Sequence, residues 1–345
     1  MIFPIHPSFK WNGSAVTLET LIVKANDLAA HELEYEKELG AFLLEWFNDL
    51  PYIDSQTSGS TGTPKVIQIP KTAMLHSAQA TGAFFDLEAG ASALHCLSAK
   101  FIAGKMMLVR GLVLGLEMDF VAPSTAPLLN NKSCYDFVAM VPLQVQNSIP
   151  ELQNVKQLLI GGAPLSDLLK QQLLPLPTQV YESYGMTETI THIAVKRLGE
   201  MAFKVLPHVT IAQDERHCLV IHAPRISDSE IVTNDLVEIV SDTQFRLLGR
   251  FDNVVNSGGI KLIPEQIEAQ LSSKISARFF IIGIPDEALG EKIILVIEGD
   301  KTDFDATAFE VLSKYERPKN VLFIPQFKET ENGKIQRKET INWFL

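Results

Sequence analysis

The sequence predicts an α/β protein, and three observations lead to this fold class. Short apolar runs such as FVAMV (137–141) and VKQLLI (155–160) alternate with helical stretches such as LSDLLKQQLL (165–174), which is typical of parallel strands with crossover helices. From about residue 203 to 248, closely spaced β-like runs separated by polar turns indicate an antiparallel subdomain. Beyond GRFDNVVNSGG (249–259), helical and strand patterns alternate again. We therefore expect a large domain over residues 1–251 and a smaller α+β domain over 252–345.

Individual elements follow from local patterns. Apolar residues spread among many glutamates over 27–50 predict one acidic amphipathic helix with a solvated face. Alternation over 66–69 predicts a strand, and 72–85 is expected to be helical. Ser166 is placed to cap the helix that follows the glycine pair at 161–162, and Pro264 is placed at the first position of a later helix.

Composition limits the class of ligand. The 345 residues are 46% hydrophobic, which is enough for a substantial core, and carry a formal net charge of -11. A nucleic-acid surface needs clustered Lys and Arg, so we expect small-molecule ligands and no nucleic-acid partner. Cys96, Cys134 and Cys218 lie far apart, which favours neither a disulfide framework nor a zinc site.

No leader-like or membrane-spanning pattern is evident at the N-terminus or elsewhere, so a cytoplasmic protein without membrane contact is expected. The sequence leaves the oligomeric state open, with a homodimer among the options.

The stretch TSGSTGTPK (57–65) combines glycines and hydroxyls with a lysine. Its glycines let successive N–H groups point into one concavity, which is a geometry that binds phosphate. It differs from the G-x-x-x-x-G-K-[ST] pattern because Pro64 precedes Lys65. A flexible linker is the alternative, although linkers do not usually end in Pro-Lys and continue as a strand. The residues expected to hold phosphates are Thr57, Ser58, Gly59, Ser60, Thr61, Gly62, Thr63 and Lys65.

Further segments follow in a fixed order: IGGAPLS (160–166), YESYGMTE (181–188), TNDLVEI (233–239), GRFDNVVNSGGIKLIPEQIE (249–268) and NGKIQRKE (332–339). Together with the first stretch, they resemble the adenylate-forming superfamily of acyl-CoA synthetases, peptide-synthetase adenylation domains and related ligases. The resemblance implies a large α/β domain with an antiparallel β subdomain, and a small mobile C-terminal domain. Because only 56 residues precede the first motif, it also implies a truncated N-terminal subdomain.

The resemblance assigns a nucleotide site. Tyr184 offers a face for adenine, Thr187 a hydroxyl for the α-phosphate, Glu188 a carboxylate for Mg²⁺ and Asp235 a carboxylate for ribose. Where the family usually has glycine before this aspartate, the chain has Asn234. The remaining residues that the resemblance places at the nucleotide are Gly161, Gly162, Ala163, Ser183, Gly185, Met186 and Arg250. Without the resemblance, an exposed turn would explain SYGMTE about as well, and a surface salt bridge is the commoner use of a lone arginine such as Arg250.

The same resemblance implies a two-step reaction with ATP, Mg²⁺ and CoA. Lys334 would reach the active site and bridge the attacking carboxylate and the α-phosphate, so that Lys334, Glu188 and Thr187 form the catalytic set. The C-terminal domain would turn about Asp252 as a hinge. Gly258 and Gly259 would line the pantetheine tunnel; a turn before the next helix is the alternative.

The segment DFVAMVPLQVQ (136–146) resembles short o-succinylbenzoate-CoA ligases of menaquinone biosynthesis. A substrate with a second carboxylate calls for a buried cation or several donors, and the candidates are Lys100, Lys105, Arg110 and His192. The expected acyl pocket comprises Lys100, Phe101, Gly104 and His192. Two alternatives stay open: an adenylation enzyme that loads an aryl or amino acid onto a carrier protein, and a nucleotide-binding module without catalysis.

Overall fold

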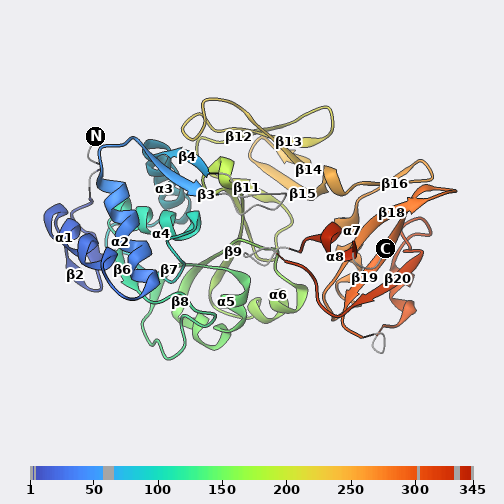
Figure 1. Ribbon diagram of the computed structural model, residues 1–345, viewed down its shortest axis with the longest axis horizontal. Helices are drawn as coiled ribbons and strands as arrows, with labels where there is room; N and C mark the ends of the chain where they lie inside the picture. The colour runs from blue at the N-terminus through green and yellow to red at the C-terminus, as the bar shows by residue number, and fades with distance from the viewer. Residues whose placement is uncertain (1–2, 4, 57–65, 301–303, 330–334, 343–345) are drawn as a thin grey trace. The chain divides into compact units, whose positions relative to one another are not determined.

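The computed structural model describes residues 3, 5–56, 66–300, 304–329 and 335–342, and the chain divides into two compact units (Figure 1). The first unit comprises Met1–Thr210 and His222–Ile231, and the second comprises Ile211–Ile221 and Val232–Leu345. The predicted phosphate stretch 57–65 and Lys334 lie outside the described residues.

The first unit contains a mainly parallel sheet with the strand order β11-β10-β9-β8-β7-β5-β6-β1-β2. Its strands are β1 (Lys10–Trp11), β2 (Ser14–Ala15), β5 (Ser92–His95), β6 (Glu117–Phe120), β7 (Tyr135–Met140), β8 (Val155–Ile160), β9 (Gln179–Gly185), β10 (His192–Arg197) and β11 (Phe203–Val205). From β6 through β5, β7 and β8 to β9 all neighbours are parallel, whereas β10 and β11 are added antiparallel. A separate antiparallel pair consists of β3 (Tyr52–Gln56) and β4 (Val66–Pro70). The predicted α/β class and the strand at 66–69 are confirmed.

The helices of this unit are α1 (Leu18–Ala29), α2 (Glu34–Phe47), α3 (Lys71–Phe85), α4 (Ile102–Leu114), α5 (Pro142–Gln146) and α6 (Asp167–Leu173). The helix expected over 72–85 is α3, and Ser166 caps α6 by accepting a hydrogen bond from the backbone N–H of Leu169 at 3.3 Å. Both local predictions are confirmed.

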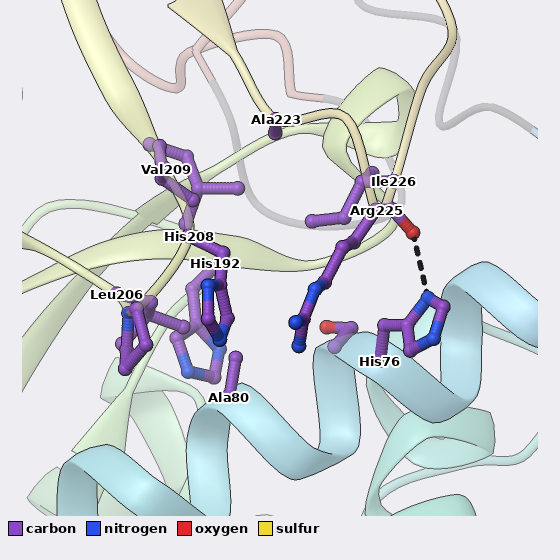
Figure 2. A pocket seen from close by; sticks show the side chains of 12 residues that line it. His76, Ala80, His192, Leu206, His208, Val209, Ala223, Arg225 and Ile226 are labelled. Carbon is purple, nitrogen blue, oxygen red and sulfur yellow. Dashed lines mark hydrogen bonds between the residues drawn. The ribbon is translucent and has the colours of Figure 1, made fainter.

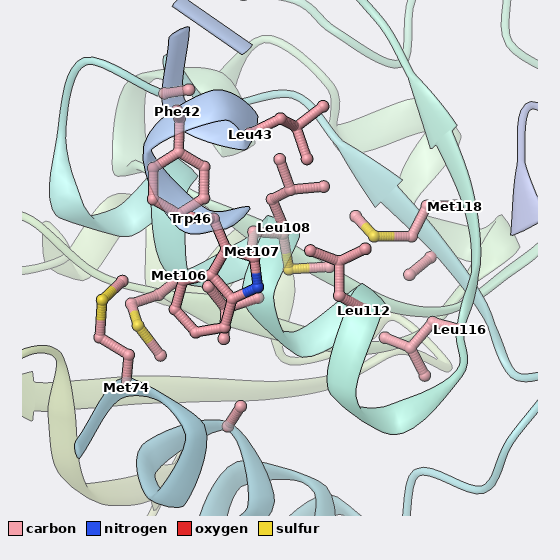
Figure 3. Close-up of a cluster of buried hydrophobic side chains, with 14 of the residues drawn as sticks. Phe42, Leu43, Trp46, Met74, Met106, Met107, Leu108, Leu112, Leu116 and Met118 are labelled. Carbon is pink, nitrogen blue, oxygen red and sulfur yellow. The ribbon is translucent and has the colours of Figure 1, made fainter. Parts of the chain in front are cut away.

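Both faces of the parallel strands are buried, which explains why these strands read as continuous apolar runs. In β7, Phe137 and Ala139 belong to one core cluster, whereas Val138 and Met140 belong to another. The first cluster contains side chains of α2, α3 and α4, among them Phe42, shown in Figure 3, and the second contains side chains of α5 and α6. Period-2 alternation thus distributes one apolar run between two helix layers.

The prediction of a single helix over 27–50 is wrong, because α1 ends at Ala29 and α2 begins at Glu34. The two helices pack closely at Gly40: a Cβ there would lie 2.3 Å from the backbone nitrogen of Ala29 and 2.5 Å from the carbonyl oxygen of Ala25. The chain therefore folds back after Ala29, and glycine permits the close approach of the two backbones.

The second unit holds the strands that the sequence predicted as an antiparallel subdomain, followed by a mixed sheet with helices. The first group comprises β12 (Thr210–Gln213), β13 (Cys218–His222), β14 (Ile231–Ser241) and β15 (Gln244–Arg250), and β14 pairs antiparallel with β15. The second comprises β16 (Val255–Ser257), β17 (Ile260–Leu262), β18 (Phe279–Asp286), β19 (Gly290–Glu298) and β20 (Asn320–Ile324), with helices α7 (Pro264–Leu271) and α8 (Arg337–Ile341). Pro264 begins α7, as predicted.

Within the described part of the chain, no helix combines the length and the apolar character that crossing a bilayer requires.

His95 is a buried titratable group at the end of β5. Its side chain is 2% exposed, its Nε2 lies 3.1 Å from the carbonyl oxygen of Gly104, and its ring stacks on Phe120. Burial lowers the pKa of His95 to about 4, although the hydrogen bond to Gly104 opposes this shift. The imidazole is therefore neutral in the folded protein at ordinary pH.

We predict that Gly40→Ala lowers the free energy of unfolding by about 3 kcal/mol, at the upper end for overpacked sites, because the atoms it meets are backbone atoms that cannot move aside. Urea denaturation followed by tryptophan fluorescence measures this, since Trp46 on α2 is buried. Ala41→Ser, at an exposed position of the same helix, serves as the control and should change stability by less than about 0.5 kcal/mol. Equal stability of the two variants would contradict the close packing of α1 against α2.

We predict that His95 makes stability depend on pH. Its pKa in the folded state lies below the unfolded value of about 6.5, so the unfolded state binds more protons between these values and stability is lost as pH falls from about 6.5. At pH 5 the loss due to His95 amounts to roughly 2 kcal/mol relative to pH 8. His95→Gln should reduce the measured loss between pH 8 and 5 by this amount, whereas His222→Gln, at an exposed site, should not. An identical pH dependence in His95→Gln and wild type would refute this.

Candidate active site

The carboxyl ends of β8 and β9 bring two of the predicted nucleotide segments together. The hydroxyl of Ser183 on β9 donates to the carbonyl oxygen of Ile160 at 2.9 Å, directly before the glycine pair. A Cβ at Gly161 would lie 2.6 Å from this hydroxyl, and Gly162 has φ +90°. Glycine is therefore needed at both positions, and Gly161, Gly162 and Ser183 border one small-residue turn at the carboxyl edge of a parallel sheet. That edge is where ligands bind in open α/β sheets.

The turn after β9 contains backbone strain that the sequence does not reveal. Ile190 has φ 67° and ψ -57°, and the N–H of Thr191 donates to the carbonyl oxygen of Thr189 at 2.7 Å. This is a γ-turn of the rare, strained type, and a β-branched residue at positive φ is a genuine outlier. A Cβ at Gly185 would lie 2.3 Å from the carbonyl oxygen of Thr191, so glycine is required beside this turn. Such strain is typical of functional sites.

The predicted side chains of this turn differ in exposure. Tyr184 is 7% exposed, and its ring centroid lies 5.8 Å from that of Phe203, so much of the ring is covered by protein. Met186 and Thr187 are half-buried and Glu188 is exposed. An exposed carboxylate can reach a hydrated cation, and Mg²⁺ usually keeps several waters, so Glu188 is suited to hold it. Among the described residues, no group of three or more His, Cys, Asp and Glu side chains forms a metal centre.

A buried polar cluster surrounds Arg110 on α4. Its side chain is 2% exposed, and its Nε donates to the hydroxyl of Thr81 at 3.3 Å, while Nη2 lies 3.4 Å from the hydroxyl of Thr191 and 3.5 Å from Nδ1 of His192. Thr81 also lies 3.4 Å from Nε2 of His192 and donates to the carbonyl oxygen of Ser77. This pattern fits a neutral imidazole that accepts at Nδ1 and donates at Nε2.

The pKa shifts of His192 and Arg110 agree with a neutral His192 beside a charged Arg110. Burial, and then the neighbouring guanidinium of Arg110, hold the pKa of His192 well below its ordinary value. Burial lowers the pKa of Arg110 to about 10, which leaves it charged at neutral pH. Arg110 forms no ion pair within the described part of the chain. The positive charge of a buried guanidinium is poorly compensated when its only partners are hydroxyl groups and a neutral imidazole.

The other cations proposed for the acyl pocket have different surroundings. Lys100 is exposed, and its ammonium lies 5.6 Å from the ring centroid of the half-buried Phe101. Lys105 is not a surface lysine: it is 8% exposed, and its Nζ donates to the carbonyl oxygen of Asp54 at 3.0 Å and lies 3.7 Å from the carboxylate of Glu45. Lys105 thus has an internal partner for its charge, whereas Arg110 does not.

Gly104, the remaining residue of the expected acyl pocket, is a packing position. A Cβ there would lie 2.1 Å from the carbonyl oxygen of Ser98. The residue is buried, and its carbonyl oxygen faces His95. The sequence alone cannot distinguish a glycine needed for this backbone approach from one that makes room for a ligand.

His192 also borders a hollow of ≈ 20 Å³ together with His76, His208 and Arg225 (Figure 2). His76 donates from Nδ1 to the carbonyl oxygen of Arg225 at 3.1 Å. The buried hydroxyl of Ser77 lines the hollow and has no hydrogen-bond partner among the described residues. The space suits one water molecule, which would satisfy that hydroxyl.

A larger hollow of ≈ 340 Å³ lies at the amino ends of the parallel strands, beside Ser92, Tyr135 and Val155. Its position at the edge opposite the glycine turn separates it from the candidate site.

In the second unit, β14 and β15 bring Asp235 and Arg250 opposite one another. The Asp235 side chain is 8% exposed, and Arg250 donates to its Oδ1 at 3.0 Å and to Oδ2 of Asp252 at 3.3 Å. An almost buried carboxylate beside a half-exposed guanidinium suits a ribose with an adjacent phosphate, because carboxylates accept from sugar hydroxyls and guanidinium groups bind phosphate oxygens.

Gly258 and Gly259 connect β16 and β17 with φ 59° and 84°. Two consecutive positive φ angles are characteristic of two-residue hairpin turns, so the turn alone accounts for both glycines. Their predicted role in a pantetheine tunnel stays a prediction.

Sequence reasoning missed two residues of the site region. Thr81, within α3, links Arg110 to His192, and a threonine in a helical pattern gives no signal of such a role. Ile190 is strained, and the only sequence signal is the neighbouring motif glycine, Gly185.

Comparison with known proteins agrees with these features. The family model for the AMP-binding enzyme matches residues 48–217. A crystal structure of an acyl-CoA synthetase (AMP-forming)/AMP-acid ligase II-like protein from Dyadobacter fermentans is 35% identical, with a TM-score of 0.63, and the match covers 92% of this chain and 97% of that protein.

A 2-succinylbenzoate--CoA ligase of Staphylococcus aureus is 26% identical over 95% of this chain and 75% of its own length. The o-succinylbenzoate coenzyme A synthetase of Bacillus subtilis in complex with ATP and magnesium has a TM-score of 0.74 over 95% of this chain and 82% of its own, and at 17% identity it supports the fold. The chain belongs to the AMP-binding, adenylate-forming enzyme family.

Proposed function

We propose that the protein is an ATP-dependent acid-CoA ligase that converts o-succinylbenzoate to o-succinylbenzoyl-CoA through an acyl-adenylate, a step of menaquinone biosynthesis. Family membership supports adenylation chemistry. Relatives named 2-succinylbenzoate--CoA ligase, at 23–26% identity, support the acid. The observation that carries the choice of a dicarboxylate is the buried Arg110.

In the first half-reaction, a carboxylate oxygen of the acid attacks the α-phosphorus of ATP, the bond to the β-phosphate oxygen breaks, and pyrophosphate leaves. Residues 57–65 would hold the β- and γ-phosphates, Thr187 the α-phosphate and Asp235 the ribose. Lys334 would lie between the attacking carboxylate and the α-phosphate, where negative charge develops. Positioning and charge stabilisation therefore suffice for this step.

Mg²⁺ held by Glu188 would neutralise phosphate charge when it is bound. In the second half-reaction, the CoA sulfur attacks the acyl carbonyl, its thiol proton passes to solvent, and AMP leaves with the bonding electrons. The thiol has to reach the acyl carbonyl from another direction than ATP does. The domain after Asp252 would turn to open that path.

Arg110 supports a substrate with a second carboxylate for an energetic reason. A charge removed from water is costly unless a partner of opposite sign compensates it. Among the described residues, Lys105 has such a partner in Glu45 and Arg110 has none. A second carboxylate of the acid would supply the missing charge and accept two parallel bonds from the guanidinium.

A coupled assay with ATP, CoA and o-succinylbenzoate tests the proposal, with acetate and benzoate as controls. We expect pyrophosphate release and thioester formation with o-succinylbenzoate and much less with either monocarboxylate. If another acid proved the better substrate, the choice of acid would be wrong; if no acid in a broad panel released pyrophosphate, the ligase function itself would be wrong.

We predict that Arg110→Met lowers kcat/KM for o-succinylbenzoate by at least about 100-fold, which corresponds to the loss of one buried charge pair. Its free energy of unfolding should stay within about 1 kcal/mol of wild type, because the hydrogen bonds lost at Thr81 and His192 are offset by removal of an uncompensated buried charge. Lys105→Met on the same helix is the matched control and should be less stable by about 1–3 kcal/mol, since it leaves Glu45 unpaired. Unchanged activity of Arg110→Met would rule out contact with the substrate.

We predict that Lys334→Ala slows adenylation by about 100- to 1000-fold, as expected for the loss of one donor to developing charge. Thioester formation from supplied o-succinylbenzoyl-adenylate and CoA should change far less, because no α-phosphate attack takes place in that step. Lys338→Ala, an exposed lysine on α8, should leave both steps unaffected. Equal slowing of the two steps by Lys334→Ala would exclude the role given to this lysine.

A further inference from the structure

Asn234, the residue that stands where the resembled family usually has glycine, bridges two charged side chains. Its Nδ2 donates to both carboxylate oxygens of Asp252, at 3.3 and 3.1 Å, and its Oδ1 accepts from Nη1 of Arg216 at 2.9 Å. A carboxylate only accepts and a guanidinium only donates, so the orientation of the amide is determined by its partners. A glycine could make neither contact.

Arg216 is itself held in place. Its Nε donates to Oδ2 of Asp214 at 2.8 Å and its Nη2 to the carbonyl oxygen of Thr233 at 3.1 Å. The guanidinium also lies 5.2 Å from the ring centroid of Phe251. The Asn234 side chain is therefore already ordered by Arg216. Less side-chain conformational entropy is lost when it binds Asp252.

Asp252 has a second donor in Arg250, at 3.3 Å, but this arginine also binds Asp235 at 3.0 Å. In the proposed function Asp235 contacts the ribose, and Arg250 beside it is suited to bind an adjacent phosphate. The other partner of Asn234 is Arg216, which Asp214 holds in turn, and the proposed function gives neither residue a role at the nucleotide. Asn234 thus holds Asp252 through a partner outside the set of residues proposed to bind the nucleotide.

A side chain beyond Asp252 also packs on the strand that precedes it. Nδ2 of Asn253 donates to Oε1 of Glu265 at 2.5 Å. Glu265 packs on Gly249, where a Cβ would lie 2.5 Å from Oε2. Rotation about the N–Cα bond of Asp252 would separate Glu265 from Gly249 and would move the Asp252 carboxylate relative to the amide of Asn234.

We propose that Asn234 is a positioning residue for the reaction: together with Arg216 it holds the carboxylate of the hinge residue Asp252 and slows the turn between the two half-reactions. The inference rests on the proposed function for the hinge role of Asp252. The contact itself is a property of the second unit and can be tested without catalysis.

Hydrogen exchange of the full-length protein provides that test. The N–H of Val254 donates to the carbonyl oxygen of Phe251 at 3.2 Å, so peptides covering 251–255 report opening at the hinge. Asn234→Ala should raise exchange there by about three- to tenfold, as expected for partly exposed hydrogen bonds to a charged group. Arg246→Ala is the matched control, because it removes an exposed ion pair with Glu238 on the same two strands without touching Asp252. It should leave exchange at 251–255 unchanged.

The second measurement compares the half-reactions. The ratio of the rate of thioester formation from supplied acyl-adenylate to the rate of adenylation should change by at least about threefold in Asn234→Ala, in line with the exchange effect. A rise means that the contact favours the adenylation arrangement and a fall means that it favours the thioester arrangement; both support the proposal.

If hydrogen exchange of Asn234→Ala at 251–255 stayed within twofold of wild type, the claim that Asn234 holds Asp252 would be wrong. If exchange rose but the ratio of the two half-reaction rates did not change, the claim that Asn234 acts in the reaction would be wrong. If wild type adenylates no acid, the proposed function fails, and the exchange measurement still decides whether Asn234 holds Asp252.

Discussion

Burial of both faces of the parallel sheet is the constraint on which the arrangement of the first unit depends. Alternate side chains of β7 enter two separate cores, so the interior of this strand is available only to apolar groups. Residues 137–140 of β7 are accordingly apolar and buried. Gly161 and Gly162 follow β8, and Gly185 ends β9, at the carboxyl edge of the sheet. Because helices bury both faces of the sheet, the candidate site lies at its carboxyl edge.

Arg110 is one of the buried charged side chains of the first unit, together with Lys71 and Lys105. Its helix, α4, contributes apolar side chains to the core, yet it also carries a guanidinium that is 2% exposed. Lys105, five residues earlier, is buried too, but it reaches Glu45 and the backbone of Asp54. A charge without a protein counterpart costs stability that a ligand can restore, which is why perturbed ionisable groups concentrate at functional sites. The neutral His192 beside it accepts from Arg110 at Nδ1 without adding a second positive charge.

The fold class, the antiparallel strands and the helix starts marked by Ser166 and Pro264 could be predicted from the sequence, because each depends on local periodicity or on the chemistry of one residue. The break between α1 and α2 could not, since it depends on the contact of Gly40 with Ala29, which lies in the other helix. The burial of Lys105 depends on Asp54 and Glu45, which are distant in sequence. The strain at Ile190 is a local turn conformation that a β-branched residue does not predict. The predicted roles of residues 57–65 and Lys334, which lie outside the described residues, rest on the family resemblance.

The account depends most on the claim that a carboxylate of the substrate compensates Arg110. The direct measurement is the ratio of kcat/KM values of the wild-type enzyme for o-succinylbenzoate and for 4-oxo-4-phenylbutanoate, which keeps the succinyl carboxylate and the ring but lacks the ring carboxylate. The account predicts a preference of at least about 100-fold for o-succinylbenzoate, because the analogue would leave the buried guanidinium unpaired. Equal kcat/KM values for the two acids would contradict it.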